Sequence, residues 1–230
     1  MEFDTFKVKI YNMSKIRFGF LLLCLVLMDY SSNAQQAFSN EIPLIKMTEP
    51  KLKRPNYLKK GDTIALVAPS GVILDNQPIL KGISVLKSWG LQVITGPNVY
   101  GKNGHFSSSD DLRLQDLQWA LDDSSIDAIW AARGGYGTAR IIDNIDFTKF
   151  LENPKWIIGY SDITVLHNAI NNIGVESIHG IMPINMSDDE QDVLESMKSL
   201  HRALFGEKLV YNVDGSPYNR EGRASGILVR

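Results

Sequence analysis

The sequence is poor in the residues that build metal sites and disulfides. It contains one cysteine and four histidines in 230 residues, and neither a CxxC nor an HExxH pattern occurs. This composition leaves little material for a metal cluster and argues against a zinc site. The single cysteine, Cys24, lies in an N-terminal apolar block, so a processed chain would contain no disulfide.

An excess of positive charge is also lacking. The formal net charge is −2, whereas nucleic-acid-binding domains usually carry a clear basic excess. We therefore expect no nucleic-acid partner. The hydrophobic content of 44% is close to that of globular proteins, and a chain of this length buries roughly 70% of its unfolded surface.

The N-terminal apolar block, Phe18 to Met28, is too short to span a bilayer comfortably. Lys15 and Arg17 precede it, and small residues that end at Ala34 follow it. This layout is typical of a secretory signal peptide. We expect an exported, periplasmic protein that is cleaved after Ala34 and keeps no stable membrane span. A lipid anchor at Cys24 and a buried core helix are the alternatives.

Short apolar runs alternate with segments of helical spacing from residue 63 onwards. The runs TIALVAPSG, LQVITGPNV, IDAIWAA, PKWIIG and GVESIHG predict strands, and the segments between them predict helices. This alternation favours an α/β fold, with a parallel sheet covered by helices on both faces, as in flavodoxin-like or Rossmann-like domains.

The alternating pattern weakens after about residue 185. One amphipathic helix follows, with Val193, Met197, Leu200 and Leu204 at helical spacing, and then strands are predicted around an Asp-Gly turn. We expect four parts, with the last ending inside a strand of an incomplete domain. They are a leader and signal peptide (1–34), a lead-in (35–58), an N-terminal α/β domain (59–185), and a linker helix with the start of a truncated C-terminal domain (186–230).

Several polar or glycine-rich segments fall where predicted strands end. They are Ser70, the loop Gly134–Gly137, Ser161 and His179. Parallel α/β folds bind ligands at the carboxyl ends of their strands, so these segments predict one site.

The loop RGGYG, Arg133 to Gly137, allows two interpretations. Glycines at a strand end let backbone N–H groups approach a phosphate or an oxyanion, but tight turns also use glycine for geometry alone. The loop does not match the dinucleotide or P-loop spacings. A flavodoxin-like nucleotide or phosphate binder would therefore rest on the glycine loop alone.

Ser161 also allows two interpretations, and its local sequence favours the simpler one. Gly159-Tyr160-Ser161 at a strand-to-helix turn resembles a nucleophile elbow, although Asp162-Ile163 replaces the usual x-Gly. A serine in this position also serves as a helix cap, which contributes about 1 kcal/mol.

The two histidines near this turn have different expected positions. His179 at a strand end fits a general base or ligand, or more commonly a hydrogen-bonded structural residue. His167 lies six residues beyond Ser161 on the predicted helix and points away from it, so it is a poor candidate for a base.

Four segments together resemble the LD-carboxypeptidase family of serine peptidases, known as family S66. These are GDTIALVAPSG, DAIWAARGGYGTARIID, PKWIIGYSDITVLHNAI and SIHGIMP, which occur in this order with family-like spacing. The family includes muramoyltetrapeptide carboxypeptidases and microcin-immunity hydrolases. The resemblance runs from about Lys59 to the C-terminus.

The resemblance implies roles for individual residues. Ser161 would be the nucleophile, and the backbone amides of Asp162 and Gly135 would form the oxyanion hole. We expect substrate contacts from residues at the same strand ends and in the glycine loop, namely Ser70, Arg133, Gly134, Tyr136 and His179. The implied substrate is a murein tetrapeptide that loses its terminal D-alanine, with no cofactor and with a homodimer as the expected assembly.

The resemblance also implies a Ser–Glu–His triad whose Glu and His belong to a C-terminal domain. The tail REGRASGILVR resembles the start of that domain, and Glu221 belongs to this early motif and not to the triad. His179 matches a family IHG segment in the first domain. We therefore expect impaired hydrolysis from these 230 residues, because a serine needs a positioned base. The alternative is a truncated, non-catalytic relative that binds muropeptide-like ligands.

Overall fold

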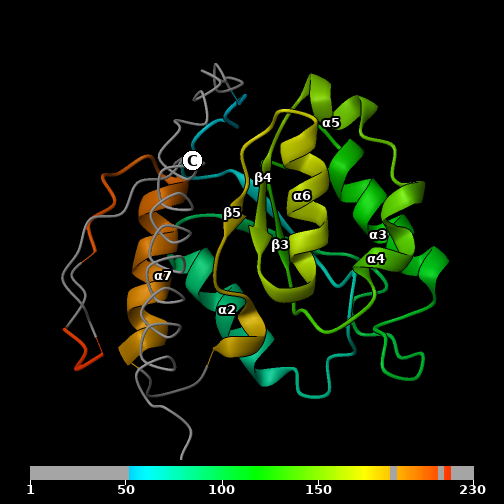
Figure 1. The fold of residues 1–230 in the computed structure, drawn as a ribbon, viewed down its shortest axis with the longest axis horizontal. Helices are drawn as coiled ribbons and strands as arrows, with labels where there is room; N and C mark the ends of the chain where they lie inside the picture. The colour runs from blue at the N-terminus through cyan, green and yellow to red at the C-terminus, as the bar shows by residue number, and fades with distance from the viewer. Residues whose placement is uncertain (1–51, 187–190, 212–214, 219–230) are drawn as a thin grey trace, which may run out of the picture. The chain divides into compact units, whose positions relative to one another are not determined.

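The computed structural model describes residues 52–186, 191–211 and 215–218 (Figure 1). The predicted leader and signal peptide and most of the predicted lead-in lie outside these residues. In the described part of the chain, no helix is long and apolar enough to cross a membrane.

The described residues form a five-stranded parallel sheet, as the sequence predicts. The strand order is β2-β1-β3-β4-β5, and each neighbouring pair is parallel. The chain moves to one side of β1 for β2 and to the other side for β3, so the sheet has a topological switch point between β1 and β3. The strands are β1 (Thr63–Val67), β2 (Gln92–Thr95), β3 (Ala128–Ala131), β4 (Trp156–Gly159) and β5 (Ile178–His179).

Alternate residues of the central strands enter two separate hydrophobic cores, one on each face of the sheet. Ile64 and Leu66 belong to one core, and Ala65 and Val67 belong to the other. The side chains of a strand alternate between its two faces, so burial on both sides explains why these strands are apolar at successive positions.

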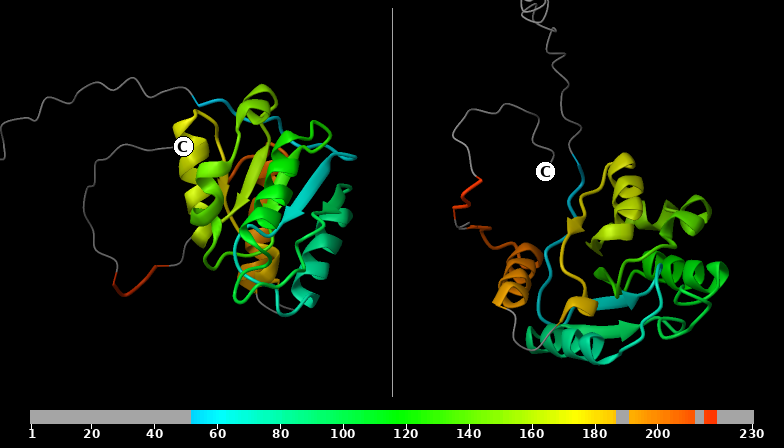
Figure 2. Two further views of the ribbon diagram at one scale, coloured as in Figure 1. Left: turned by 90° about the vertical axis from the view of Figure 1, so that its right-hand side faces the viewer. Right: turned by 60° about the horizontal axis from the view of Figure 1, so that its bottom comes forward.

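Helices cover both faces of the sheet, as predicted (Figures 1 and 2). The first core contains buried residues of α2 and α7, and the second contains buried residues of α3, α4, α5 and α6. Ser109 caps α3 by accepting a hydrogen bond from the Leu112 amide. The helices are α2 (Gln77–Ser88), α3 (Asp110–Asp122), α4 (Thr138–Ile141), α5 (Thr148–Glu152), α6 (Thr164–Asn172) and α7 (Gln191–Leu204), with 3-10 turns η1 (Ile142–Asn144), η2 (Ser161–Ile163) and η3 (Pro183–Asn185).

Helix α7 packs on the core of the sheet. Its residues Met197, Leu200 and Leu204 are buried in the same cluster as Ile64, and the Leu204 carbonyl accepts a hydrogen bond of 2.8 Å from the Leu58 amide. Beyond α7, residues 208–211 and 215–218 contain no strand, and the rest of the predicted Asp-Gly hairpin lies outside the described residues. The predicted division of the chain into domains stays a prediction.

Gly82 lets α2 pack closely on the sheet. A Cβ atom added there would lie 2.9 Å from the Trp130 indole and 2.9 Å from the Pro183 ring. Both neighbours are rigid ring systems, so moving them to relieve the contact would cost free energy.

We therefore expect Gly82→Ala to lower the free energy of unfolding by roughly 1–3 kcal/mol. This loss would outweigh the gain in helix propensity of about 1 kcal/mol. Urea denaturation measures the effect. Ser84→Ala, an exposed substitution in the same helix, is the control and should change stability by less than about 0.5 kcal/mol. A Gly82→Ala variant as stable as the wild type would contradict this packing.

Candidate active site

Ser161 lies at a sharp turn that follows β4. Among the described residues other than glycine, it alone has a positive φ, at 61°. Such backbone geometry costs of order 1–3 kcal/mol in a non-glycine residue and is concentrated at functional sites. Gly159 permits the tight turn, because a Cβ there would meet the Ile163 side chain at 3.0 Å.

The Ser161 side chain is available for chemistry. The residue is exposed, and its hydroxyl makes no hydrogen bond to any residue in the described part of the chain. The residue at the cap of η2 is Tyr160, and no side chain caps either η2 or α6. The structure therefore shows no cap made by Ser161, which was the simpler interpretation of its sequence.

The glycine loop that follows β3 lies directly against this turn. A Cβ on Gly134 would be 3.0 Å from the Ser161 Cβ and 3.2 Å from its Oγ. Gly135 and Gly137 have φ values of 120° and 153°, which side chains other than glycine rarely adopt. The loop also contacts the segment after β1, where the Gly71 amide donates a 3.2 Å hydrogen bond to the Gly134 carbonyl.

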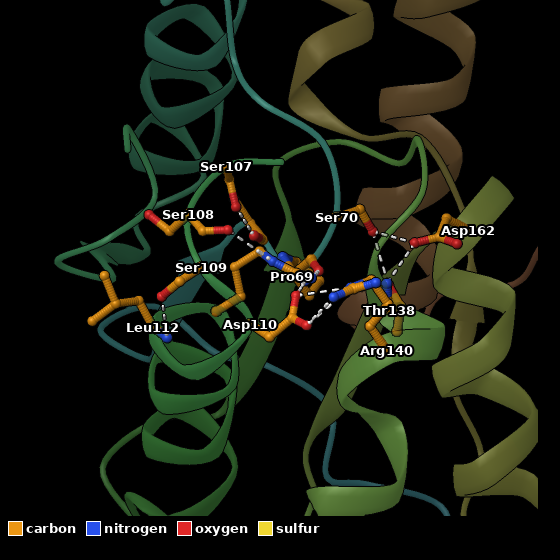
Figure 3. A network of polar contacts seen from close by, with 12 residues as sticks. Pro69, Ser70, Ser107, Ser108, Ser109, Asp110, Leu112, Thr138, Arg140 and Asp162 are labelled. Carbon is orange, nitrogen blue, oxygen red and sulfur yellow. Dashed lines mark hydrogen bonds and ion pairs between the residues drawn. The ribbon is translucent and has the colours of Figure 1, made fainter. Parts of the chain in front are cut away.

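The Asp162 side chain joins the three strand ends (Figure 3). Its Oδ2 atom accepts hydrogen bonds from the Ser70 hydroxyl at 2.6 Å and from the Thr138 amide at 2.8 Å. The hydroxyls of Ser70 and Thr138 are themselves 2.8 Å apart. Segments that follow β1, β3 and β4 thus meet at one carboxylate.

The predicted substrate-binding residues differ in their exposure. Ser70 is fully buried, and the half-buried Arg133 donates to the carbonyls of Val72 at 2.5 Å and Gly134 at 3.2 Å. Tyr136 is 53% exposed, and His179 is also exposed, with its ring centroid 6.0 Å from that of Tyr160.

His167 supports the turn from within the protein. Its Nε2 lies 2.9 Å from the Gly159 carbonyl, and its Nδ1 lies 2.8 Å from the Ser177 hydroxyl. Because a carbonyl only accepts, Nε2 carries the proton and Nδ1 accepts from Ser177. Burial lowers the pKa of His167, and the neighbouring His179 adds to that decrease. Both ring nitrogens are thus engaged, in agreement with the expectation that His167 is a poor candidate for a base.

A second polar network lies beside the glycine loop, and sequence reasoning missed it (Figure 3). Asp110 pairs with Arg140 at 2.7 Å and also with the buried Arg113, which donates to the Pro69 carbonyl. The hydrogen bond from Arg140 contributes most to lowering the pKa of Asp110. Next to this network is an open cavity of about 510 Å³, lined by Asn103, Gly104, His105, Phe106, Asp110, Asp111 and Arg140.

Thr138 was also missed by sequence reasoning. It begins a helix directly after the glycine loop, and that position was its only signal. In the described part of the chain, no three His, Cys, Asp or Glu side chains are grouped so that they could hold a metal ion.

A strained, exposed serine between a parallel strand and a helix, beside a glycine loop, is the arrangement of a serine-hydrolase nucleophile elbow. Residues 64–180 match the family model of the LD-carboxypeptidase N-terminal domain. The probable murein peptide carboxypeptidase of Bacillus subtilis is 36% identical over 180 residues, 76% of this chain and 56% of that protein. The murein tetrapeptide carboxypeptidase of Pseudomonas aeruginosa is 30% identical over 175 residues, 71% of this chain and 56% of that protein.

A solved structure gives the same result. The MccF-like protein of Bacillus anthracis superposes with a TM-score of 0.61 at 28% identity, covering 66% of this chain and 47% of that chain. The chain belongs to the LD-carboxypeptidase family, which confirms the resemblance stated from its motifs. It spans about half the length of the curated relatives it matches.

The lowered pKa of His167 predicts an effect of pH on stability. Below about pH 6.5 the unfolded chain binds a proton at this histidine while the folded protein does not. The contribution of His167 to the free energy of unfolding is therefore fully present above that pH, and it is lost as the pH falls toward the lower pKa of the folded state. We expect the advantage in Tm of the wild type over His167→Gln to shrink between pH 7.5 and 5.5.

Thermal unfolding monitored by circular dichroism tests this expectation. His105→Gln is the matched control, because it makes the same substitution at an exposed histidine. The expected slope is at most about 1.4 kcal/mol per pH unit for a single proton. A difference between wild type and His167→Gln that stays constant with pH would show that His167 is not held neutral by burial.

Proposed function

We propose that this chain carries the nucleophile and oxyanion hole of a serine carboxypeptidase that removes the terminal D-alanine from murein tetrapeptides. The observation that supports it most is Ser161, which is exposed, strained at φ 61° and in contact with the glycine loop. Membership of the LD-carboxypeptidase family adds the class of reaction. The names of two relatives, a probable murein peptide carboxypeptidase and a murein tetrapeptide carboxypeptidase, add the class of substrate.

The proposed reaction proceeds through an acyl-enzyme. The Ser161 oxygen bonds to the carbonyl carbon before the terminal D-alanine, and a base takes the hydroxyl proton. The amides of Asp162 and Gly135 stabilise the negative oxygen that results. The carbon–nitrogen bond then breaks, and D-alanine leaves with the proton. Water then bonds to the acyl carbon and gives a proton to the base. The bond from that carbon to the Ser161 oxygen breaks, the oxygen takes up the proton, and the shortened peptide is released.

The base and its orienting carboxylate would come from outside the described residues. His167 cannot serve, because both of its ring nitrogens bond to the protein. By family resemblance, a glutamate and a histidine of a C-terminal domain fill these roles. The chain spans about half of its curated relatives, and we propose that the part corresponding to their remaining length supplies both groups.

We expect Ser161→Ala to abolish D-alanine release by the full-length product of this gene. Loss of the nucleophile in a serine hydrolase lowers kcat by on the order of 10⁶. Release of D-alanine from a purified murein tetrapeptide, followed by chromatography, measures the effect. Ser88→Ala, which removes an exposed hydroxyl on α2, is the matched control and should leave kcat unchanged.

Two outcomes of that experiment would count against the proposal. Normal turnover by Ser161→Ala would refute the assignment of the nucleophile. No turnover by either protein, together with binding of the tetrapeptide by both, would favour a non-catalytic binder of muropeptide-like ligands.

Gly134→Ala tests the contact between the loop and the nucleophile. An added Cβ would displace Ser161, because it would lie 3.0 Å from the Ser161 Cβ. We expect kcat to fall by about 10- to 100-fold with little change in KM, since small misplacements of a reacting group have effects of this size. Gly215→Ala is the control, because a Cβ there meets nothing within 4 Å. Unchanged kcat in Gly134→Ala would place the reacting group elsewhere.

A further inference from the structure

The residue after the nucleophile has a second feature besides its backbone amide. Asp162 carries a carboxylate that reaches from the turn after β4 to the segments after β1 and β3. We infer that this carboxylate is a positioning group, which holds the glycine loop so that the amides of Gly135 and Asp162 face the same oxyanion. This inference rests on the function proposed above and concerns the side chain of Asp162, together with Ser70 and Thr138.

The directions of the hydrogen bonds follow from the number of protons available. The Ser70 hydroxyl has a single proton, which it donates to Asp162 Oδ2. The 2.8 Å contact between the two hydroxyls therefore has Thr138 as donor and Ser70 as acceptor. Thr138 also donates its backbone amide to the same Oδ2 atom. Each hydroxyl proton of the network is thus used, and the carboxylate oxygen receives two donors.

Burial raises the free-energy cost of breaking these hydrogen bonds. Ser70 and Thr138 are both 0% exposed, so water does not replace a lost partner. Hydrogen bonds to a charged acceptor are roughly twice as strong as those between neutral groups. Removal of the carboxylate would leave the Thr138 amide unpaired in the interior, and the loop would have to move to satisfy it.

The glycine loop needs such an anchor because of its composition. Three of its four residues between 134 and 137 are glycines, which have the most backbone freedom to lose on folding. One end of the loop is held by the Gly71 amide and by Arg133, which donates to the Val72 carbonyl. The other end is held by the bond from Thr138 to Asp162. Gly135 lies between these two attachments.

This inference changes the role expected for Ser70. Its hydroxyl is buried and committed to Asp162, so it acts on the loop and does not contact the substrate. It also adds Thr138, whose amide is the point where the loop is attached. One residue, Asp162, thus provides an oxyanion amide from its backbone and fixes the opposite amide through its side chain.

The test compares three variants of the full-length protein by steady-state release of D-alanine. We expect Asp162→Ala to lower kcat by about 10²-fold with KM within about threefold. The reason is that a misplaced amide weakens the hydrogen bond to the oxyanion, and that bond forms mainly in the transition state. Asp162→Asn keeps an acceptor oxygen and should recover most of this loss. Ser70→Ala removes one of the two donors and should lower kcat by about tenfold.

Two controls separate positioning from stability and from charge. Gly82→Ala destabilises the protein on the face of the sheet that α2 covers, opposite the face covered by α4 and α6. It should leave kcat unchanged at temperatures below its unfolding transition. Asp143→Ala removes an exposed carboxylate just after α4 and should also leave kcat unchanged. Hydrogen exchange followed by mass spectrometry gives a readout independent of activity, with faster exchange of residues 134–138 in Asp162→Ala and not in Asp143→Ala.

Wild-type kcat in Asp162→Ala, or unchanged exchange of the loop, would overturn the inference. A loss of kcat equal in Asp162→Ala and Gly82→Ala would overturn it as well, because stability alone would explain the effect. The proposed function fails separately. If Ser161→Ala abolishes turnover and Asp162→Ala does not, the hydrolase assignment survives and the positioning role does not. If Ser161→Ala retains turnover, the function is wrong, and the exchange data alone decide whether Asp162 anchors the loop.

Discussion

Parallel pairing of β1, β3 and β4 sets the geometry on which the candidate site depends. Leu66 pairs with Trp130, and Trp130 pairs with Ile158, so the three strands end at one edge of the sheet. The segments that leave these strands must then pack against one another. This is why Ser70, the glycine loop and Ser161 meet, although up to 91 residues separate them in the sequence. Ligand sites at such edges are a general property of open parallel sheets.

Small residues and one carboxylate make this meeting possible. Gly71, Gly134 and Gly137 each lie where a Cβ would come within about 3 Å of a neighbouring segment. Close approach brings backbone amides together, but amides alone do not hold a glycine-rich loop in one conformation. The Asp162 carboxylate provides the missing constraint, because it accepts hydrogen bonds from two segments at once. Arg133 contributes in the same way by donating to carbonyl groups.

Much of the fold could be predicted from the sequence because each element has a strong local signal. The runs around Ile64, Ile129 and Ile157 are apolar and β-branched, and each occurs as a buried strand. A Ser/Asp-rich segment precedes α3, a composition that is typical of helix N-caps, and Ser109 caps the helix. Short elements were harder to predict. The helix after the glycine loop has only four residues and continues as a 3-10 turn. Few local interactions determine the length of so short a helix, so its sequence carries a weak signal.

The sequence by itself determined the alternation of strands and helices, the glycine-rich turn and the family to which the chain belongs. Its local pattern favoured a cap at Ser161, since that pattern contains no information about what lies across the turn. Only the tertiary structure decided that Ser161 is exposed, with no hydrogen-bond partner for its hydroxyl among the described residues. It also decided that Ser70 is buried and shares the Asp162 carboxylate with Thr138. The physical reason is that these properties depend on contacts between segments that the parallel sheet brings together, and no short stretch of sequence contains both partners.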